Sequence, residues 1–297
     1  MKTRKNLFNA SFEQSEQIVP NLFTDKPFFY DFANAESMEF FKRLFVIVVV
    51  LIFDVMSYGI GVACPELISE DPFAEGGEFI SDSIIQGIAY FTFLKPIIYL
   101  SLIVWTILVI INIFPKKDYS VQRAFGALNL IMMIVTTIYF CSMPMLLGVC
   151  LGALGWFGFG LVCLYGVLFL FSSSTKKSNE IKNELYGQDT FKNEDSTIIK
   201  FWNFIQRFWL IVLILIIVNV IFFRFGMWGE KTIWSVWGIL GPVYFLLVTG
   251  FSYGFMELFV STFYFVKYSK QYKEEWQPTD EEWYGKRKAK KMAKKKK

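Results

Sequence analysis

Long apolar segments separated by short charged ones run through most of the chain, and this pattern predicts membrane-spanning helices. A helix needs about 20 apolar residues to cross roughly 30 Å of hydrocarbon. Segments 44–64 and 93–114 reach this length, and each contains one charged residue, Asp54 and Lys95 respectively. We therefore predict the first two spans there.

The stretch 124–175 carries no formal charge and is long enough for two spans joined by a tight turn. We predict these spans at 125–146 and 150–172. Proline and glycine favour turns. Those that mark the predicted turn or its flanks are Pro144, Gly148 and Gly152.

Two further apolar segments complete the predicted membrane domain. Segment 208–223 is bracketed by Arg207 and Arg224, and segment 239–264 contains a single charge, Glu257. The sequence thus predicts an all-α integral membrane protein, with six transmembrane helices packed as three antiparallel hairpins.

The distribution of basic residues predicts the orientation. Six spans place both termini on one side of the membrane, and 27 of the 30 Lys and Arg residues fall on that side. The stretch 65–90, on the other side, has acidic residues and no basic ones. Because cytoplasmic loops are enriched in Lys and Arg, we predict that both termini are cytoplasmic.

The two tails flank the membrane domain, which is predicted at 44–266. The N-terminal tail, 1–43, ends in a predicted amphipathic segment at 37–44. The C-terminal tail, 267–297, is basic, and the charge run at 286–297 predicts a segment that is disordered when free and adheres to an anionic inner leaflet. Its last twelve residues contain no aromatic side chain, so no specific nucleic acid is expected as a partner.

The predicted location is the cell membrane, as a multi-pass protein, with a bacterial inner membrane preferred. Lys294 and Lys295 also fit a dilysine retrieval signal of the endoplasmic reticulum. That membrane is the alternative.

Composition narrows the chemistry. The chain is 54% hydrophobic and 19% charged, with a mean hydropathy of +0.41, which excludes a soluble globular enzyme and a disordered chain. It contains no histidine, and none of its four cysteines has C-x-x-C spacing. Histidine-based catalysis and His-ligated metals are therefore excluded, and we expect no metal site and no cofactor.

Asp54 is the most informative polar residue. At the centre of a span a carboxylate costs about 2.5–3.5 kcal/mol, so it should face protein or water. Ser57, Tyr58 and Gly61 share its helical face. The functional interpretation is an ion- or proton-coupling site, or a ligand contact. The structural alternative is an ion pair, or a protonated carboxyl hydrogen-bonded to a neighbouring helix.

Two glycine patterns predict close helix packing. Gly250 and Gly254 share a face of the last span with Glu257, which then either lines a cavity or reaches water at the inner boundary. A second set lies on one face early in the fourth span. Its members are Gly148, Gly152 and Gly155.

Lys95 and Asn219 are further intramembrane polar candidates. Lys95 either extends its side chain to the headgroups or pairs with Asp54. Asn219 is a candidate for a hydrogen bond between helices.

These features favour a non-enzymatic membrane component, an accessory or permease-like subunit of a transport, export or immunity system. A protein partner or homo-oligomer is expected. One alternative is a membrane-embedded enzyme that acts on lipid-linked substrates with Asp54 and Glu257. The other is a stand-alone channel or secondary transporter that uses Asp54.

Overall fold

The computed structural model describes residues 6–21, 38–70, 81–114, 116–187, 206, 209–227 and 233–295. All regular elements in these ranges are helices, and four helical runs are long and apolar enough to cross a membrane. These runs are Phe40–Glu70, Asp82–Ile113, Tyr119–Tyr186 and Ser235–Lys267. The protein is thus an all-α membrane protein, as the sequence predicts.

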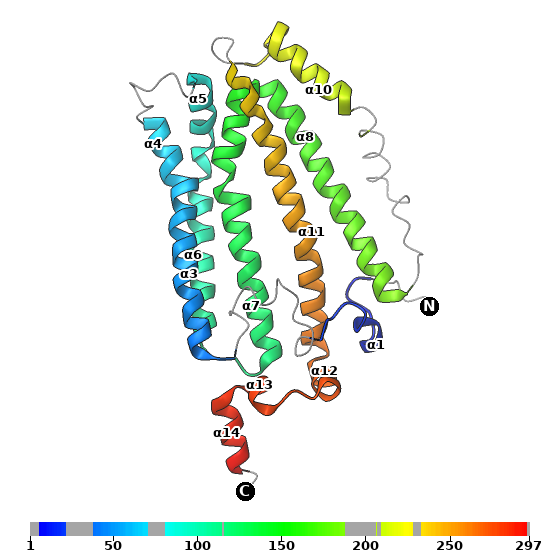
Figure 1. Ribbon diagram of the computed structural model, residues 1–297. Helices are drawn as coiled ribbons and strands as arrows, with labels where there is room; N and C mark the ends of the chain where they lie inside the picture. Colours follow the sequence, from blue (N-terminus) through cyan, green and yellow to red (C-terminus); the bar gives the residue numbers. More distant parts are fainter. Residues whose placement is uncertain are drawn as a thin grey trace.

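The first two runs lie side by side with opposite directions (Figure 1). The second run begins at Asp82, so the span predicted at 93–114 starts too late. The first run consists of α3 (Phe40–Tyr58), the π-helical η2 (Gly59–Ala63) and α4 (Cys64–Glu70). The second consists of α5 (Asp82–Tyr90), the 3-10 helix η3 (Phe91–Leu94) and α6 (Lys95–Ile113).

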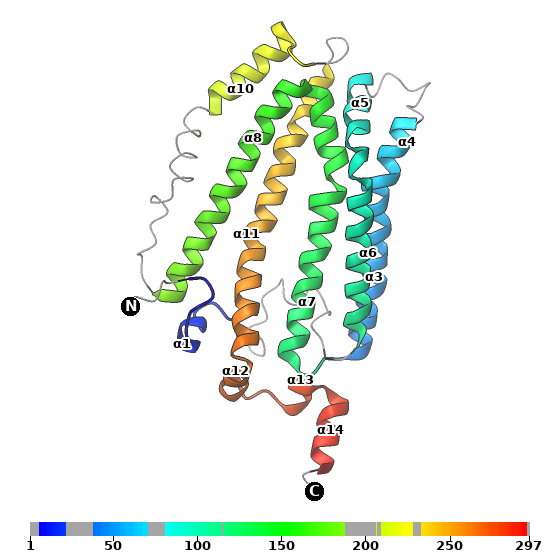
Figure 2. The same ribbon diagram turned by 180° about the vertical axis from the view of Figure 1, so that it is seen from behind.

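The third run is divided by a sharp turn at Gly155. A straight helix from Tyr119 to Tyr186 would measure about 100 Å, more than three times the hydrocarbon thickness. Gly155 has φ 67° and ψ 177°, which only glycine adopts readily, and the chain reverses there (Figures 1 and 2). The run consists of α7 (Tyr119–Ile134), the π-helical η4 (Val135–Cys141) and α8 (Met143–Tyr186).

The turn predicted between 146 and 150 is therefore wrong, and the two arms are 119–154 and 156–186. Pro144 lies in the first turn of α8, where the missing N–H of proline costs no hydrogen bond. Gly148 and Gly152 lie within the helix, where α5 packs against them. These three residues signal helix start and helix packing rather than a turn.

The segment predicted as the fifth span, 208–223, is described from Trp209 as α10 (Trp209–Val218) and the π-helical η6 (Asn219–Phe223). It is a shorter apolar helix and does not reach the length of a span. It lies near one end of the bundle, and the C-terminus of α8 lies at the other end (Figure 1). The last run, the 3-10 helix η7 (Ile233–Ile239) with α11 (Leu240–Lys267), contains the predicted sixth span.

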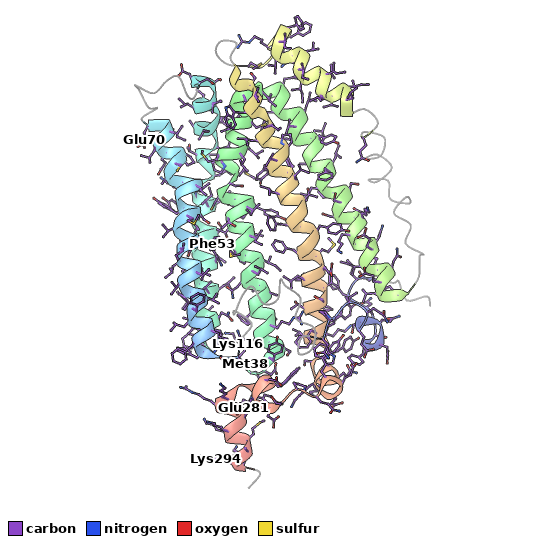
Figure 3. The ribbon with its side chains drawn as sticks, viewed as in Figure 1. Met38, Phe53, Glu70, Lys116, Glu281 and Lys294 are labelled. Atoms are coloured by element: carbon purple, nitrogen blue, oxygen red, sulfur yellow. The ribbon has the colours of Figure 1, made fainter. Side chains whose placement is uncertain are left out.

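Residues 6–21 and the C-terminal helices lie at one end of the bundle (Figure 1). Lys116, Glu281 and Lys294 are at this end, and Glu70 is at the other (Figure 3). We call residues 6–21 together with α12, α13 and α14 the terminal layer. α1 (Phe12–Ser15) belongs to residues 6–21. The C-terminal helices are α12 (Ser269–Trp276), α13 (Asp280–Tyr284) and α14 (Lys286–Lys295). The basic run predicted to be disordered is helical over 286–295, where it forms α14, and its first turn contacts Glu39 and Lys117.

Apolar side chains cover the outside of the bundle. Phe41, Val55 and Phe222 are each more than two thirds exposed. Burying such side chains stabilises a chain by about 1.5–3 kcal/mol each, so an aqueous environment would disfavour this surface. A lipid bilayer provides the apolar surroundings that these helices lack within the chain. The amphipathic segment predicted at 37–44 is continuous with α3, which begins at Phe40.

Candidate functional site

Asp54 lies midway along the first run, near the end of α3, next to Phe53, which Figure 3 labels between the two ends of the bundle. One of its carboxyl oxygens, Oδ2, is 2.8 Å from Oγ1 of Thr106 on α6. Its other oxygen, Oδ1, is buried and has no hydrogen-bond partner among the described residues. The carboxyl group faces protein rather than lipid, which both interpretations of the sequence require.

Two more buried polar atoms without a hydrogen-bond partner in the described part of the chain lie on the neighbouring helices. They are Nε1 of Trp105 on α6 and Oγ1 of Thr136 on η4. Both side chains are fully buried. A buried polar group without a partner costs about 1–3 kcal/mol, so each of these three atoms calls for an explanation.

The backbone around Asp54 is also irregular. η2 and η4, both π-helical, face each other, and a Cβ added at Gly61 would lie 2.8 Å from Cα of Cys141. Glycine at 61 therefore allows the first and third runs to approach closely. Single π-helical turns are frequent at functional sites, because they break the regular hydrogen-bond ladder of the helix.

Glu257 belongs to a different cluster, between α8 and α11. The ammonium Nζ of Lys177 is 2.7 Å from Oε2 of Glu257 and 4.6 Å from the ring centroid of Tyr253. The hydroxyl of Tyr253 donates a hydrogen bond to Glu180. Lys177 is 9% exposed at its side chain and Glu257 is 55% exposed, so the pair is buried on one side and open on the other.

Replacing Lys177 with methionine should destabilise the contact between α8 and α11. The change removes the ion pair with Glu257 and the cation–π contact with Tyr253, at a cost of about 1–2 kcal/mol. Thermal unfolding in detergent measures the effect. Lys176→Met is the matched control, because Lys176 is 59% exposed and 4.0 Å from Glu180, and exposed pairs contribute little. Equal melting temperatures for the two variants would contradict this assignment.

Asp54 and Glu257 do not form a joint site. The partner of Asp54 is on α6, and the partner of Glu257 is on α8, with α7 between these pairs (Figure 1). The pairing of Lys95 with Asp54 is wrong, because Lys95 pairs with Glu66 of α4. This pair joins α4 to the beginning of α6.

Asn219 makes its hydrogen bonds within its own helix end. Its Oδ1 accepts from the N–H of Phe225 at 3.0 Å, and its Nδ2 donates to the carbonyl of Phe225 at 3.3 Å. These bonds hold the chain where Arg224 takes a left-handed conformation, with φ 52°. The predicted bond between helices is wrong, and Asn219 caps the apolar helix 210–223 instead.

The glycines divide into two groups. A Cβ at Gly148 would lie 2.7 Å from Cα of Ile88, and one at Gly152 would lie 2.3 Å from the carbonyl of Ser83, so α5 needs both glycines. A Cβ at Gly250 or Gly254 would meet nothing within 4 Å. The tight helix pair predicted for that face is therefore not formed in the described chain.

Gly155 forms the turn and lets the loop after η6 approach closely. The N–H of Trp156 donates to the carbonyl of Gly226 at 3.0 Å, and a Cβ at Gly155 would lie 2.4 Å from the same oxygen. Its role is thus a close approach at a reversal of the chain rather than packing along a helix face.

Tyrosine hydroxyls attach residues 6–21 to the bundle, and this arrangement was not predicted from the sequence. Tyr264 on α11 accepts from the N–H of Ala10 at 2.9 Å and donates to the carbonyl of Leu7 at 2.7 Å. Tyr268 donates to the carbonyl of Ala10 at 2.7 Å. Tyr272 on α12 is 2.6 Å from the hydroxyl of Ser15.

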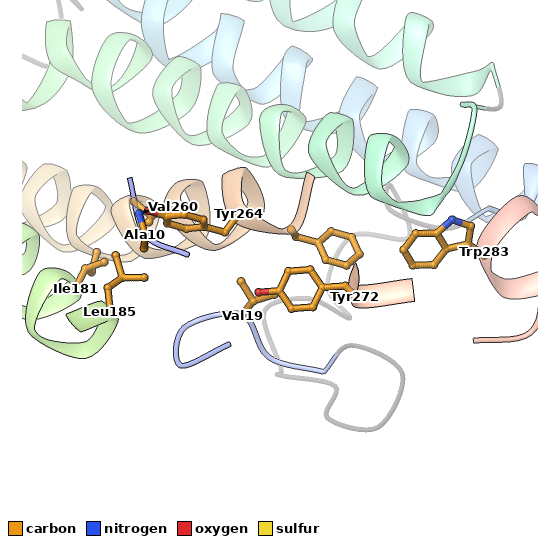
Figure 4. Packing of buried hydrophobic residues seen from close by; sticks show 9 residues of the cluster. Ala10, Val19, Ile181, Leu185, Val260, Tyr264, Tyr272 and Trp283 are labelled. Atoms are coloured by element: carbon orange, nitrogen blue, oxygen red, sulfur yellow. Dashed lines mark hydrogen bonds between the residues drawn. The ribbon is translucent and has the colours of Figure 1, made fainter. Parts of the chain in front are cut away.

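Apolar packing supports these hydrogen bonds (Figure 4). The cluster joins the N-terminal segment to the ends of α8 and α11, to α12 and to α13. Burial raises the pKa of Tyr272, so its hydroxyl keeps its hydrogen at neutral pH. The buried members of the cluster are Ala10, Val19, Ile181, Leu185, Val260, Tyr264, Phe265, Tyr272 and Trp283.

The attachment of residues 6–21 should weaken slightly as pH rises. Burial, and then the hydrogen bond and charge of Glu275, raise the pKa of Glu16 above 4.5. A raised carboxyl pKa contributes stability below the unfolded value, and that stability is lost as pH rises through the folded value. Glu16→Gln should therefore slow amide exchange in residues 6–21 about twofold at pH 7, with no difference at pH 4, because exposed charges interact weakly. An equal effect at both pH values would contradict this explanation.

In the described residues no group of three or more Cys, Asp or Glu side chains is placed to hold a metal ion. Comparisons with protein-family models, with curated proteins and with solved structures found no match. The residues and their geometry are therefore the basis for any functional assignment.

Proposed function

We propose that this protein is a non-enzymatic membrane subunit, accessory or permease-like, of a transport, export or immunity system. It holds a protein partner at the cytoplasmic face through the terminal layer. The observation that carries this proposal is the way both ends of the chain fold together on α8 and α11. A bundle that only needed to fill the bilayer would not require five separate elements packed in one cluster at one end, with residues 6–21 held there by tyrosine hydroxyl bonds.

The proposed topology has six membrane crossings with both termini in the cytoplasm. Two arms meet at Gly155, and the apolar segment 208–223 is the proposed fifth crossing. This assignment places the basic residues of α14 and Lys116 on the cytoplasmic side, in accord with the positive-inside rule. The cell membrane is the proposed location.

α14 is the proposed contact for the partner. Seven of its ten residues are basic, and it extends away from the bundle along the direction of the long helices (Figures 1 and 2). Lys286 lies 3.8 Å from Glu39, and Lys288 donates to the carbonyl of Lys117, so the helix is fixed at its first turn. This direction favours an acidic protein surface over the anionic leaflet, which a helix lying along the membrane would contact better.

Purification from native membranes in mild detergent tests this proposal. Three chains are compared: the natural one, a variant with Lys290, Lys291, Lys294 and Lys295 changed to glutamine, and a control with the same four changed to arginine. A stoichiometric protein partner should be retained by the natural chain and the arginine control, and lost from the glutamine variant. The proposal would be contradicted if the natural chain is recovered without a partner, or if all three chains retain the partner equally.

A second candidate function is a stand-alone secondary transporter. The observation that favours it is the half-satisfied carboxyl of Asp54 in the middle of the bundle. Under this alternative the natural chain purifies as a monomer or homo-oligomer, and Asp54→Asn abolishes transport in reconstituted vesicles.

A further inference from the structure

The hydrogen bonds of Thr106 favour a protonated carboxyl group at Asp54. Oγ1 of Thr106 lies 2.8 Å from the carbonyl of Leu102 and 2.8 Å from Oδ2 of Asp54. A threonine hydroxyl has one hydrogen, and a carbonyl has none to give. The hydroxyl can donate to either oxygen, but its single hydrogen cannot fully satisfy both. Both contacts become full hydrogen bonds when Thr106 donates to Leu102, four residues earlier, and accepts from a protonated carboxyl group of Asp54.

Charged groups near Asp54 do not oppose this conclusion. Along the first run the nearest charged residues are Arg43 of α3 and Glu66 of α4, each about 16–18 Å away at 1.5 Å per residue. On α6 the nearest is Lys95, about 16 Å along the helix from Thr106. The titratable residues of η4 are Tyr139 and Cys141, both neutral in their ordinary state, and η2 has none. A carboxylate at Asp54 would thus lack a counter-charge on the described elements packed against it.

The three partnerless atoms occupy neighbouring levels of three adjacent helices. Val50 of α3 and Trp105 of α6 belong to one buried cluster, against which Met132 and Met133 of α7 pack. Asp54 is one helical turn beyond Val50, and Thr136 is one turn beyond Met132. α3 and α7 both run away from the terminal layer, so these steps lead to the same level (Figure 1).

The atoms at this level complement one another. Oδ1 of Asp54 is an acceptor, the indole N–H of Trp105 is a donor only, and the hydroxyl of Thr136 is either. A buried water typically makes about three hydrogen bonds to groups that otherwise lack partners. A water held among them would accept from Trp105 and donate to Asp54 and Thr136.

We propose that Asp54, Trp105 and Thr136 form a hydrated proton-binding site in the middle of the bundle, in which Asp54 carries a proton at neutral pH and an internal water joins the three side chains. The hydroxyl of Thr106 accepts the hydrogen bond from the carboxyl O–H. The bound species is thus a proton with its water. This site is independent of the terminal layer, so its test and the test of the partner proposal fail separately.

Infrared difference spectroscopy of the full chain in lipid tests the site. The natural protein should show a carboxylic C=O band at neutral pH, and Asp54→Asn should remove it. Asparagine has the shape of a protonated carboxyl group, so this variant should fold normally. Persistence of the whole band in Asp54→Asn, or its absence from the natural protein at neutral pH, would overturn the proton assignment.

The water is tested by the same measurement in H₂¹⁸O. An O–H band of an internal water should shift with the heavy isotope, and Thr136→Val and Trp105→Phe should each abolish it. Thr136→Val should also shift the C=O band of Asp54, which remains informative if Asp54→Asn does not fold. Thr175→Val on α8 is the matched control and should change neither band. A Thr136→Val protein that keeps the water band and shows no shift of the C=O band would overturn the hydrated site.

Discussion

Gly152→Ala is expected to lower the melting temperature of the bundle by about 5–10 °C. The new Cβ would lie 2.3 Å from the carbonyl of Ser83 and 2.5 Å from Cα of Ile84, both backbone atoms of the α5 region. These atoms yield only if α5 moves away from α8. Overpacking of this kind costs about 1–3 kcal/mol, and each kcal/mol shifts the melting temperature of a domain of this size by roughly 2–4 °C.

Gly254→Ala is the matched control for this prediction. Both glycines are in long helices, but a Cβ at Gly254 would meet nothing within 4 Å. Alanine favours a helix over glycine by about 1 kcal/mol, so this variant should melt at the same temperature as the natural chain or slightly higher. Thermal unfolding in detergent, followed by the fraction that stays monodisperse, measures both. If Gly254→Ala lowers the melting temperature more than Gly152→Ala does, the packing of α5 on α8 is assigned wrongly.

Tyr264→Phe is expected to release residues 6–21 from the bundle. The ring of Tyr264 is fully buried and would stay in place, but the change removes the bonds to Ala10 and Leu7. Leaving the buried N–H of Ala10 without a partner costs about 1–3 kcal/mol. Amide exchange at Ala10 should therefore rise by about tenfold to a hundredfold, since 1.4 kcal/mol is a factor of ten.

The control for this second prediction is Tyr90→Phe. Tyr90 is 53% exposed and contacts Trp156 through its ring, so loss of its hydroxyl should leave exchange at Ala10 unchanged. Exchange at Ala10 that is unaffected in Tyr264→Phe would mean that the tyrosine bonds do not hold the N-terminal segment.

The membrane class follows from the sequence because long apolar runs and the distribution of charge are local properties. The sequence pattern does not locate the turn at Gly155, and the reason is physical. Pro144, Gly148 and Gly152 resemble turn residues in composition, but proline also starts helices and glycine also permits close helix packing. Which role a glycine has depends on the neighbour that approaches it, and here the neighbour is α5, distant in the sequence.

The same limit applies to the polar sites. The sequence identifies Asp54 as a candidate because a carboxylate inside an apolar run is costly wherever it packs. Trp105 and Thr136 gave no such signal, since an apolar helix commonly contains both residue types. Glu257, like Asp54, is a carboxylate inside an apolar run and is therefore visible in the sequence. Lys177 lies in a charged segment that is typical of a cytoplasmic loop. Only the long extension of α8 brings Lys177 against α11.

Cysteine accessibility in intact cells tests the central claim most directly, namely that the terminal layer is cytoplasmic and available to a partner there. In a chain whose four cysteines are replaced by alanine, single cysteines are placed at Asp82 and at Lys290, which are exposed at opposite ends of the bundle. A membrane-impermeant maleimide should label Asp82→Cys in intact cells and Lys290→Cys only after permeabilisation. Labelling of Lys290→Cys in intact cells, with Asp82→Cys protected, would contradict the account.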